Sequence, residues 1–184
     1  KVHVISEDME QAERSPDLLA DARERAPIRI LVVDDEHTLR ESCASFLQSI
    51  GHVVEVSGRG EDALRLLQTR RYDIVLLDLH LPDVSGMSLL QACLEKHSAT
   101  VVIIMTGKPS VDSSLAALQK GAWDYLTKPF SATQFEILIG RAAHKVRMGR
   151  GADLAGSDTG RLRGLREPIA VLGLAWIILD QAVA

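Results

Sequence analysis

The sequence predicts an α/β protein, a parallel β-sheet of five strands with five helices packed on its two faces. Five short apolar runs, rich in Val, Ile and Leu, recur between residues 28 and 147. Segments with the apolar spacing of an amphipathic helix separate these runs. Strands that alternate with helices are typical of parallel sheets, because each right-handed crossover lays its helix on a face of the sheet.

Each expected strand is an apolar run whose ends are marked by polar residues or glycine. The most apolar runs are ILVV, IVLL and VVIIM, which precede Asp34, Asp78 and Thr106. Runs of this kind indicate strands that are buried on both faces of the sheet. In chain order, the expected strands cover residues 28–33, 52–56, 73–77, 100–105 and 122–126.

The expected helices carry apolar residues on one face and end at glycine or polar residues. In the first helix, this face consists of Leu39, Cys43, Phe46, Leu47 and Ile50. Gly51 and Gly121 follow the first and fourth helices, at a position where glycine commonly ends a helix. In chain order, the expected helices cover residues 36–50, 60–69, 87–96, 111–120 and 132–147.

One domain, residues 28–147, is expected between two flanking segments. Residues 1–27 are polar and acidic and form an N-terminal extension. Residues 148–184 are expected to form a linker and an apolar C-terminal segment, without a complete output domain. Residues 149–160 are rich in Gly, Asp, Ser and Ala, as flexible linkers are. The apolar run 169–179 is shorter than the roughly 20 residues of a membrane span, so we expect it to pack against protein and not to enter a membrane.

Composition excludes several classes of protein. The net charge of −4 argues against a domain that mainly binds nucleic acid, since such domains usually carry a basic surface, and no nucleic-acid-binding domain is expected in this chain. Cys43 and Cys93 lie in helical patterns without metal-type spacing, and we expect buried, reduced thiols. No signal-peptide pattern is visible at the start, so the expected location is cytoplasmic.

Polar residues follow the strands at the positions where their carboxyl ends are expected. They are Asp34, Asp35, Asp78, Thr106 and Lys128. In open parallel sheets, functional sites lie outside the carboxyl ends of the strands. A flavodoxin-like strand order, 2-1-3-4-5, would place the ends of the first and third strands side by side. The sequence does not reveal this order directly, but the acidic cluster requires it.

Three neighbouring carboxylates repel one another unless a proton or a cation intervenes. A hard cation such as Mg²⁺ prefers carboxylate oxygens. Lys128 and Thr106 could then hold phosphoryl oxygens while Asp78 attacks phosphorus as a nucleophile. The cluster therefore predicts metal-assisted phosphoryl chemistry.

Each of these residues has a simpler interpretation when it is taken alone. Asp34 or Asp35 could cap the following helix, and Asp78 could be a turn residue. Thr106 before a glycine is common where a strand meets a loop, and Lys128 could be a solvated loop lysine. Only the five together, each at a strand end and in this order, are specific.

Residues 28–147 resemble the receiver domain of bacterial two-component response regulators. The resemblance depends on the stretches VVDDE, DIVLLDLHLPDVSG, VVIIMTG and GAWDYLTKPF. It implies that Asp78 is the phosphoacceptor and that Lys128 and Thr106 contact the phosphoryl group. It also implies Mg²⁺ ligands, which are Asp35, Asp78 and the backbone carbonyl of His80, with Asp34 assisting. The Lys128–Pro129 peptide bond is expected to be cis.

The resemblance further implies a phosphorylation-dependent switch that a histidine kinase or a histidine phosphotransfer protein drives. Thr106 would move toward the phosphoryl group and Tyr125 would move inward, which alters the face formed by segments 111–120, 122–126 and 132–147. We expect this face to control an output, which we expect to be transcription, and to allow homodimerisation. A fainter resemblance is to enhancer-binding activators of the alternative sigma factor, but no G-x-x-x-x-G-K-[ST] motif is present to form an ATPase.

Two other functions remain open at this point. A phosphatase of the haloacid-dehalogenase type also uses an aspartate nucleophile, but it normally has a second aspartate where this chain has His80. The other is an interaction module that is never phosphorylated, against which the intact acidic cluster argues. His80 and Lys108 lie two residues after Asp78 and Thr106, and we expect them to influence the lifetime of an aspartyl phosphate.

Overall fold

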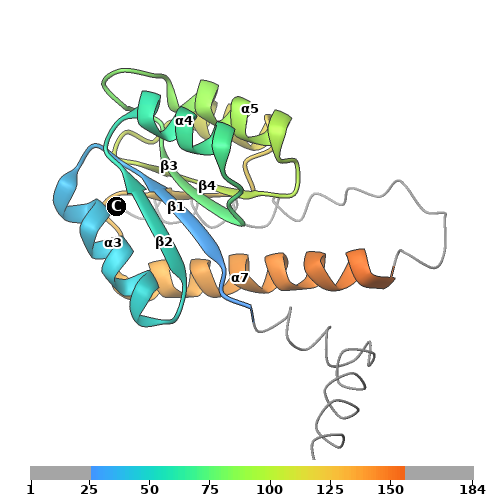
Figure 1. Cartoon of the computed structure of the whole chain (residues 1–184). Helices are drawn as coiled ribbons and strands as arrows, with labels where there is room; N and C mark the ends of the chain where they lie inside the picture. The colour runs from blue at the N-terminus through green and yellow to red at the C-terminus, as the bar shows by residue number, and fades with distance from the viewer. Residues whose placement is uncertain (1–25, 156–184) are drawn as a thin grey trace, which may run out of the picture.

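The computed structural model describes residues 26–155, which form one parallel sheet between two layers of helices (Figure 1). The strands are β1 (Arg29–Val33), β2 (Val53–Ser57), β3 (Ile74–Asp78), β4 (Val101–Thr106) and β5 (Asp124–Thr127). The helices of this part of the chain are α3 (His37–Ser49), α4 (Gly60–Thr69), α5 (Gly86–Lys96), α6 (Val111–Gln119) and α7 (Ala132–Ala155). Every expected strand and helix is therefore present, with small shifts at most ends.

The sheet has the order β2-β1-β3-β4-β5, and all of its neighbouring strands are parallel. This confirms the flavodoxin-like 2-1-3-4-5 topology. The direction of winding reverses at β1, so the chain leaves β1 and β3 at adjacent points, where Val33 pairs with Leu77. Asp34 directly follows β1, and Asp78 is the last residue of β3. The topology thus brings the two acids together across a wide gap in sequence.

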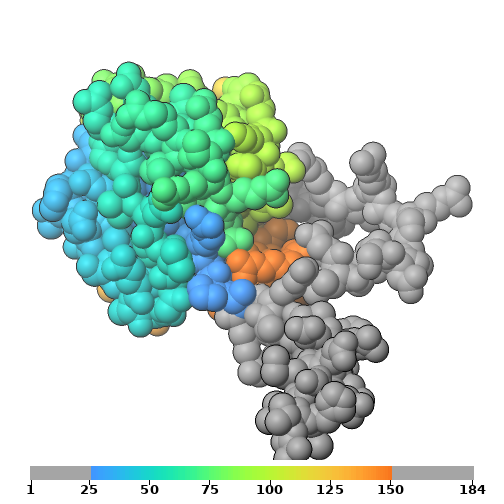
Figure 2. Space-filling model, viewed as in Figure 1, coloured from blue at the N-terminus to red at the C-terminus, as the bar shows by residue number. Residues whose placement is uncertain are grey.

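Two hydrophobic clusters fill the space on either side of the sheet. One lies between the sheet and helices α3 and α7, and the other between the sheet and helices α4, α5 and α6. All residues of β3 and β4 are buried, as the uninterrupted apolar runs predict. In the space-filling view, α4 and α5 lie side by side over one face of the sheet, bordered by α3 and β2 (Figure 2).

Helix α7 continues past Arg147 to Ala155, which corrects the expected end of the helix and the expected start of a linker at 149. Glycine costs a helix about 1 kcal/mol relative to alanine, and tertiary contacts stabilise this part of α7. Val146 is buried, and the Arg150 guanidinium donates to the Ala26 carbonyl at 3.1 Å and to Asp73 Oδ2 at 2.8 Å. The remaining expectations for the flanking segments, including the apolar run 169–179, lie outside the described residues.

Cys43 and Cys93 are free and buried, as the sequence predicts. Burial raises the pKa of each thiol to about 11, so both remain protonated at neutral pH. Within residues 26–155, no helix combines the length and the apolar character that crossing a membrane would require.

Candidate functional site

Three carboxylates meet where β1 and β3 end. One oxygen from each of Asp34, Asp35 and Asp78 lies within 4.8 Å of the others. Asp34 is fully buried, Asp78 is 5% exposed, and Asp35 is exposed. The cluster is therefore closed on the protein side and open to solvent at Asp35.

Lys128 places its ammonium between the two buried acids. Its Nζ lies 2.5 Å from Asp34 Oδ2 and 2.7 Å from Asp78 Oδ2. The backbone directs it there, because the Lys128 N–H donates to the Thr106 carbonyl at 2.8 Å and the Lys128–Pro129 bond is cis, as expected. Burial alone would lower the pKa of Lys128, but hydrogen bonds and charges from Asp34 and Asp78 raise it overall. The side chain is therefore a cation at neutral pH.

The charges of the site are not balanced by Lys128 alone. Burial raises the pKa of Asp34 above its usual 3.8, and the hydrogen bond and charge of Lys128 oppose this effect only in part. One ammonium faces three carboxylates, so two negative charges remain when all three acids are ionised. A small divalent cation with a preference for oxygen ligands fits both this charge and this donor set.

Neither acid after β1 caps helix α3, which was the simpler interpretation of Asp34 and Asp35. Glu36 occupies the N-cap position, and no side chain bonds there as a cap. Asp34 Oδ1 instead accepts a hydrogen bond from the Glu36 N–H at 3.0 Å. This bond turns the chain directly after β1 and holds Asp34 in the site.

Thr106 ends β4 with its side chain fully buried. Its Oγ1 lies 2.9 Å from His80 Nδ1 and accepts a hydrogen bond of 3.3 Å from the Lys108 N–H. The backbone N–H of His80 donates to Asp78 Oδ1 at 2.9 Å. His80, two residues after Asp78, thus connects the ends of β3 and β4.

The loop after β3 packs tightly against Asp78. A Cβ added to Gly86 would lie 2.3 Å from the Asp78 carbonyl oxygen and 2.6 Å from Leu79 Cα, so only glycine fits here. In the same loop, Asp83 accepts hydrogen bonds from the N–H groups of Gly60 and Glu61 at the start of α4. These bonds lower the pKa of Asp83 and connect the loop to α4. The sequence alone did not reveal the role of Asp83.

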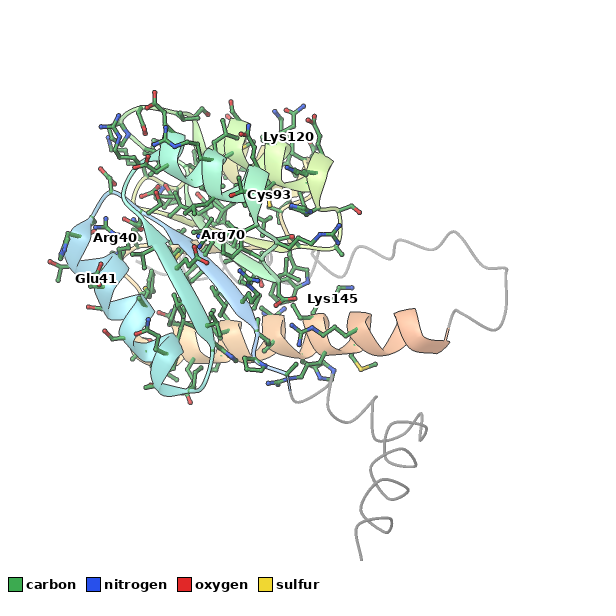
Figure 3. The ribbon with its side chains drawn as sticks, viewed as in Figure 1. Arg40, Glu41, Arg70, Cys93, Lys120 and Lys145 are labelled. Atoms are coloured by element: carbon green, nitrogen blue, oxygen red, sulfur yellow. The ribbon has the colours of Figure 1, made fainter. Side chains whose placement is uncertain are left out.

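Arg40 is a second residue whose contact with the site the sequence alone does not reveal. It lies near the start of α3, beside the end of β1, and its side chain is 12% exposed (Figure 3). Its guanidinium donates to the Asp34 carbonyl oxygen at 2.7 Å and would clash with a Cβ at Gly58. An arginine six residues after an acid is too common a pattern to identify such a contact from sequence.

Tyr125 lies on β5, outside the acidic cluster. Its side chain is buried, with 8% of its surface exposed. Its hydroxyl is buried without a hydrogen-bond partner in the part of the chain that the structure describes. The switch role of Tyr125 remains a prediction.

A family model described as the response regulator receiver domain matches residues 30–139. The chain belongs to this family. The match includes Asp34, Asp35, Asp78, Thr106 and Lys128, so the domain that supplies the acidic site is a receiver domain. Receiver domains are signalling domains of two-component systems, so the match favours a signalling domain over a metabolic enzyme for residues 30–139.

The receiver domain has relatives among regulatory proteins of bacteria. It is 34% identical over 128 residues to the regulatory protein LuxO of Vibrio vulnificus, which covers 69% of this chain and 28% of that protein. It is 38% identical over 107 residues to the transcriptional regulatory protein DltR of Streptococcus agalactiae, covering 58% of this chain and 48% of DltR. The chain therefore spans less than half the length of either relative.

Solved receiver domains have the same fold. A CheY-like receiver domain protein from Methanospirillum hungatei superposes with a TM-score of 0.65 at 26% identity, over 67% of this chain and 99% of that one. The receiver domain of a LuxO repressor protein from Vibrio parahaemolyticus gives a TM-score of 0.64 at 27% identity, over 67% and 95% of the two chains.

Proposed function

We propose that this receiver domain is a phosphorylation-dependent switch in which Asp78 accepts a phosphoryl group from a phosphohistidine. The donor would be a histidine kinase or a histidine phosphotransfer protein. The placement of the Asp78 carboxylate supports this proposal best. One of its oxygens accepts a hydrogen bond from the His80 backbone N–H and the other from Lys128, in an acidic cluster that opens to solvent at Asp35.

The transfer requires one bond to form and one to break. A carboxylate oxygen of Asp78 attacks phosphorus as the P–N bond of the phosphohistidine breaks, and the bonding electron pair stays on the donor imidazole nitrogen. The Lys128 ammonium already contacts Asp78 Oδ2, so it would be close enough to donate a hydrogen bond to a phosphoryl oxygen on Asp78 and to stabilise its negative charge. The Thr106 hydroxyl would hydrogen-bond another phosphoryl oxygen. Attack of water on phosphorus later releases phosphate and restores the carboxylate.

Asp34, Asp35, Asp78 and the backbone carbonyl of His80 would hold Mg²⁺. When bound, Mg²⁺ neutralises negative charge that develops on the phosphoryl oxygens. The protein contributes the rigid position of the ligands, since Asp34 Oδ1 accepts a hydrogen bond from the Glu36 N–H and the Asp34 carbonyl oxygen accepts one from the Arg40 guanidinium. Asp35, the exposed member, would give the cation access from solvent.

The readout of the switch would be the face that α6, β5 and α7 form. Tyr125 lies on β5 between these helices in sequence, and it would respond to movement of Thr106 at the end of the neighbouring strand β4. We propose that this face controls an output, that this output is transcription, and that the same face allows two copies to dimerise. LuxO and DltR are regulatory proteins, which supports a regulatory output.

Phosphorylation by a small-molecule donor tests the proposal. The intact protein and its Asp78→Ala variant are incubated with Mg²⁺ and acetyl phosphate and then weighed by mass spectrometry. We expect one phosphoryl adduct, which hydroxylamine removes, on the original protein and none on Asp78→Ala. Asp112→Asn is the matched control, because Asp112 is an exposed residue at the start of α6.

The other outcomes separate the alternatives. An adduct that persists in the Asp78→Ala variant would show that another residue is the acceptor. Steady hydrolysis of phosphate esters would favour a phosphatase. A protein that forms no adduct and hydrolyses nothing would fit an interaction module that is never phosphorylated.

A further inference from the structure

The hydrogen bond between His80 and Thr106 occupies a group that the proposed switch needs. His80 follows the end of β3 and Thr106 ends the neighbouring strand β4, so the bond crosses between two strand ends. The imidazole is 49% exposed, whereas Thr106 is fully buried. The His80 ring therefore lies over a hydroxyl that is otherwise enclosed by protein.

A threonine hydroxyl has one proton to donate and two lone pairs that can accept. The Lys108 N–H donates to Oγ1 at 3.3 Å, and His80 Nδ1 lies 2.9 Å away on another side. Where Nδ1 is the acceptor, the bond uses the only proton of the hydroxyl. Where Nδ1 carries a proton, it donates to a lone pair and still ties the rotamer of Thr106 to the imidazole. Either tautomer thus restrains the same side chain.

Thr106 is not engaged with the phosphoacceptor in the structure. Among residues 26–155, the Asp78 carboxylate accepts hydrogen bonds from Lys128 Nζ and from the backbone N–H of His80, and none from Thr106 Oγ1. His80 Nδ1 is 4.0 Å from Asp78 Oδ1, so the ring lies close to both the threonine and the aspartate. A phosphoryl group on Asp78 would enter the space beside this ring.

We propose that His80 is a positioning residue that holds the Thr106 hydroxyl in its unphosphorylated orientation. Phosphorylation of Asp78 exchanges the His80–Thr106 hydrogen bond for one between Thr106 and a phosphoryl oxygen. This inference rests on the proposed function of Asp78. It gives His80 a function through its side chain, in addition to the role of its backbone carbonyl as a metal ligand.

Binding of beryllofluoride with Mg²⁺ tests this inference without interference from hydrolysis, because this phosphoryl analogue forms no covalent acyl phosphate. Without the restraint, Thr106 reaches the analogue at lower cost. His80→Ala should therefore tighten beryllofluoride binding about threefold to tenfold, which corresponds to one hydrogen bond. His80→Asn keeps a polar atom near the position of Nδ1 and should restore the original affinity.

A double-mutant cycle with Thr106→Val separates the hydrogen bond from other effects of the imidazole. Valine has the shape of threonine and lacks the hydroxyl, so the effect of His80→Ala should disappear in the Thr106→Val background. A ring that only shields the site from water, or that only fills space, would change affinity equally in both backgrounds. His144→Ala, an exposed histidine on α7, is the control and should change nothing.

A spectroscopic measurement on the protein free of metal and phosphate examines the restraint itself. Methyl NMR of Thr106, assigned with Thr106→Val, should report a different side-chain rotamer population in His80→Ala and the original one in His80→Asn. An unchanged Thr106 signal in His80→Ala would overturn the inference. So would an affinity change that survives in the Thr106→Val background.

Different results would contradict the proposed function and the role of His80. A protein that binds no beryllofluoride in the presence of Mg²⁺ would contradict the proposed function, and the inference would fall with it. A protein that binds the analogue with the same affinity before and after His80→Ala would contradict only the role of His80.

Discussion

Replacing Lys128 with methionine should lower the free energy of unfolding by about 3 kcal/mol in buffer without divalent cations. Lys128 is the ammonium between Asp34 and Asp78, and its side chain is only 12% exposed. Removing one partner of a buried ion pair costs about 3 to 5 kcal/mol, because the remaining charge is left buried and uncompensated. We expect the lower end of this range, since Asp35 keeps the cluster open to water.

The same variant should gain more from Mg²⁺ than the original protein. In the original protein, a divalent cation shares the carboxylates with the Lys128 ammonium. In Lys128→Met the cation has no such competitor, so it binds more tightly and stabilises the folded state by a larger amount. A ligand at about 100 times its dissociation constant adds about 2.7 kcal/mol, so the difference between the two proteins is measurable.

Urea unfolding at pH 7, with EDTA and then with Mg²⁺, measures both effects. Lys145→Met is the matched control, because Lys145 is an exposed lysine on α7 (Figure 3), and its substitution should change stability by no more than about 0.5 kcal/mol. A loss below about 1 kcal/mol in EDTA would contradict the ion-pair argument. An equal gain from Mg²⁺ in both proteins would contradict the competition between lysine and cation.

Three further substitutions test single features of the site. Asp34→Asn should raise the free energy of unfolding of the metal-free protein at neutral pH. Burial raises the pKa of Asp34, so this gain in stability over the original protein should grow as the pH rises from 3.8 through the raised pKa and shrink as the pH falls. An advantage that does not depend on pH would refute this. Gly86→Ala should cost about 2 kcal/mol in urea unfolding, since the added methyl group would meet the Asp78 backbone; an unchanged midpoint would contradict the close packing. Tyr125→Phe should raise the free energy of unfolding by about 1 kcal/mol, because it removes a buried hydroxyl that has no partner among the described residues, and a loss of stability would indicate a hidden partner.

The strands and most helix bounds followed from local pattern. The runs that end at Asp78 and Thr106 are uniformly apolar because β3 and β4 are buried on both faces, and this property is visible residue by residue. Local pattern failed at the end of α7. The glycines after Arg147 have low helix propensity, and contacts of Arg150 with residues far away in sequence stabilise the helix there.

The members of the site were predictable, but their mutual contacts were not. Asp34, Asp78 and Lys128 follow strands, so their position at the carboxyl edge followed once a parallel sheet was inferred. Nothing in the sequence indicates the contacts of the Arg40 guanidinium with the Asp34 carbonyl, of the Asp83 carboxylate with the start of α4, or of the His80 imidazole with Thr106. Such contacts depend on loop conformation and on side-chain rotamers, which no periodicity encodes.

By itself the sequence determined a parallel α/β domain, a set of acids, a threonine and a lysine at one edge of its sheet, and the chemistry that these groups can perform. Composition and periodicity carry that information, because burial on both faces of a strand and polarity at its end are local properties. Only the tertiary structure decided that β1 and β3 are neighbours, that Lys128 lies between two buried carboxylates, and that His80 holds Thr106. These facts depend on segments separated by many residues, whose approach is set by packing of the whole sheet and its helices.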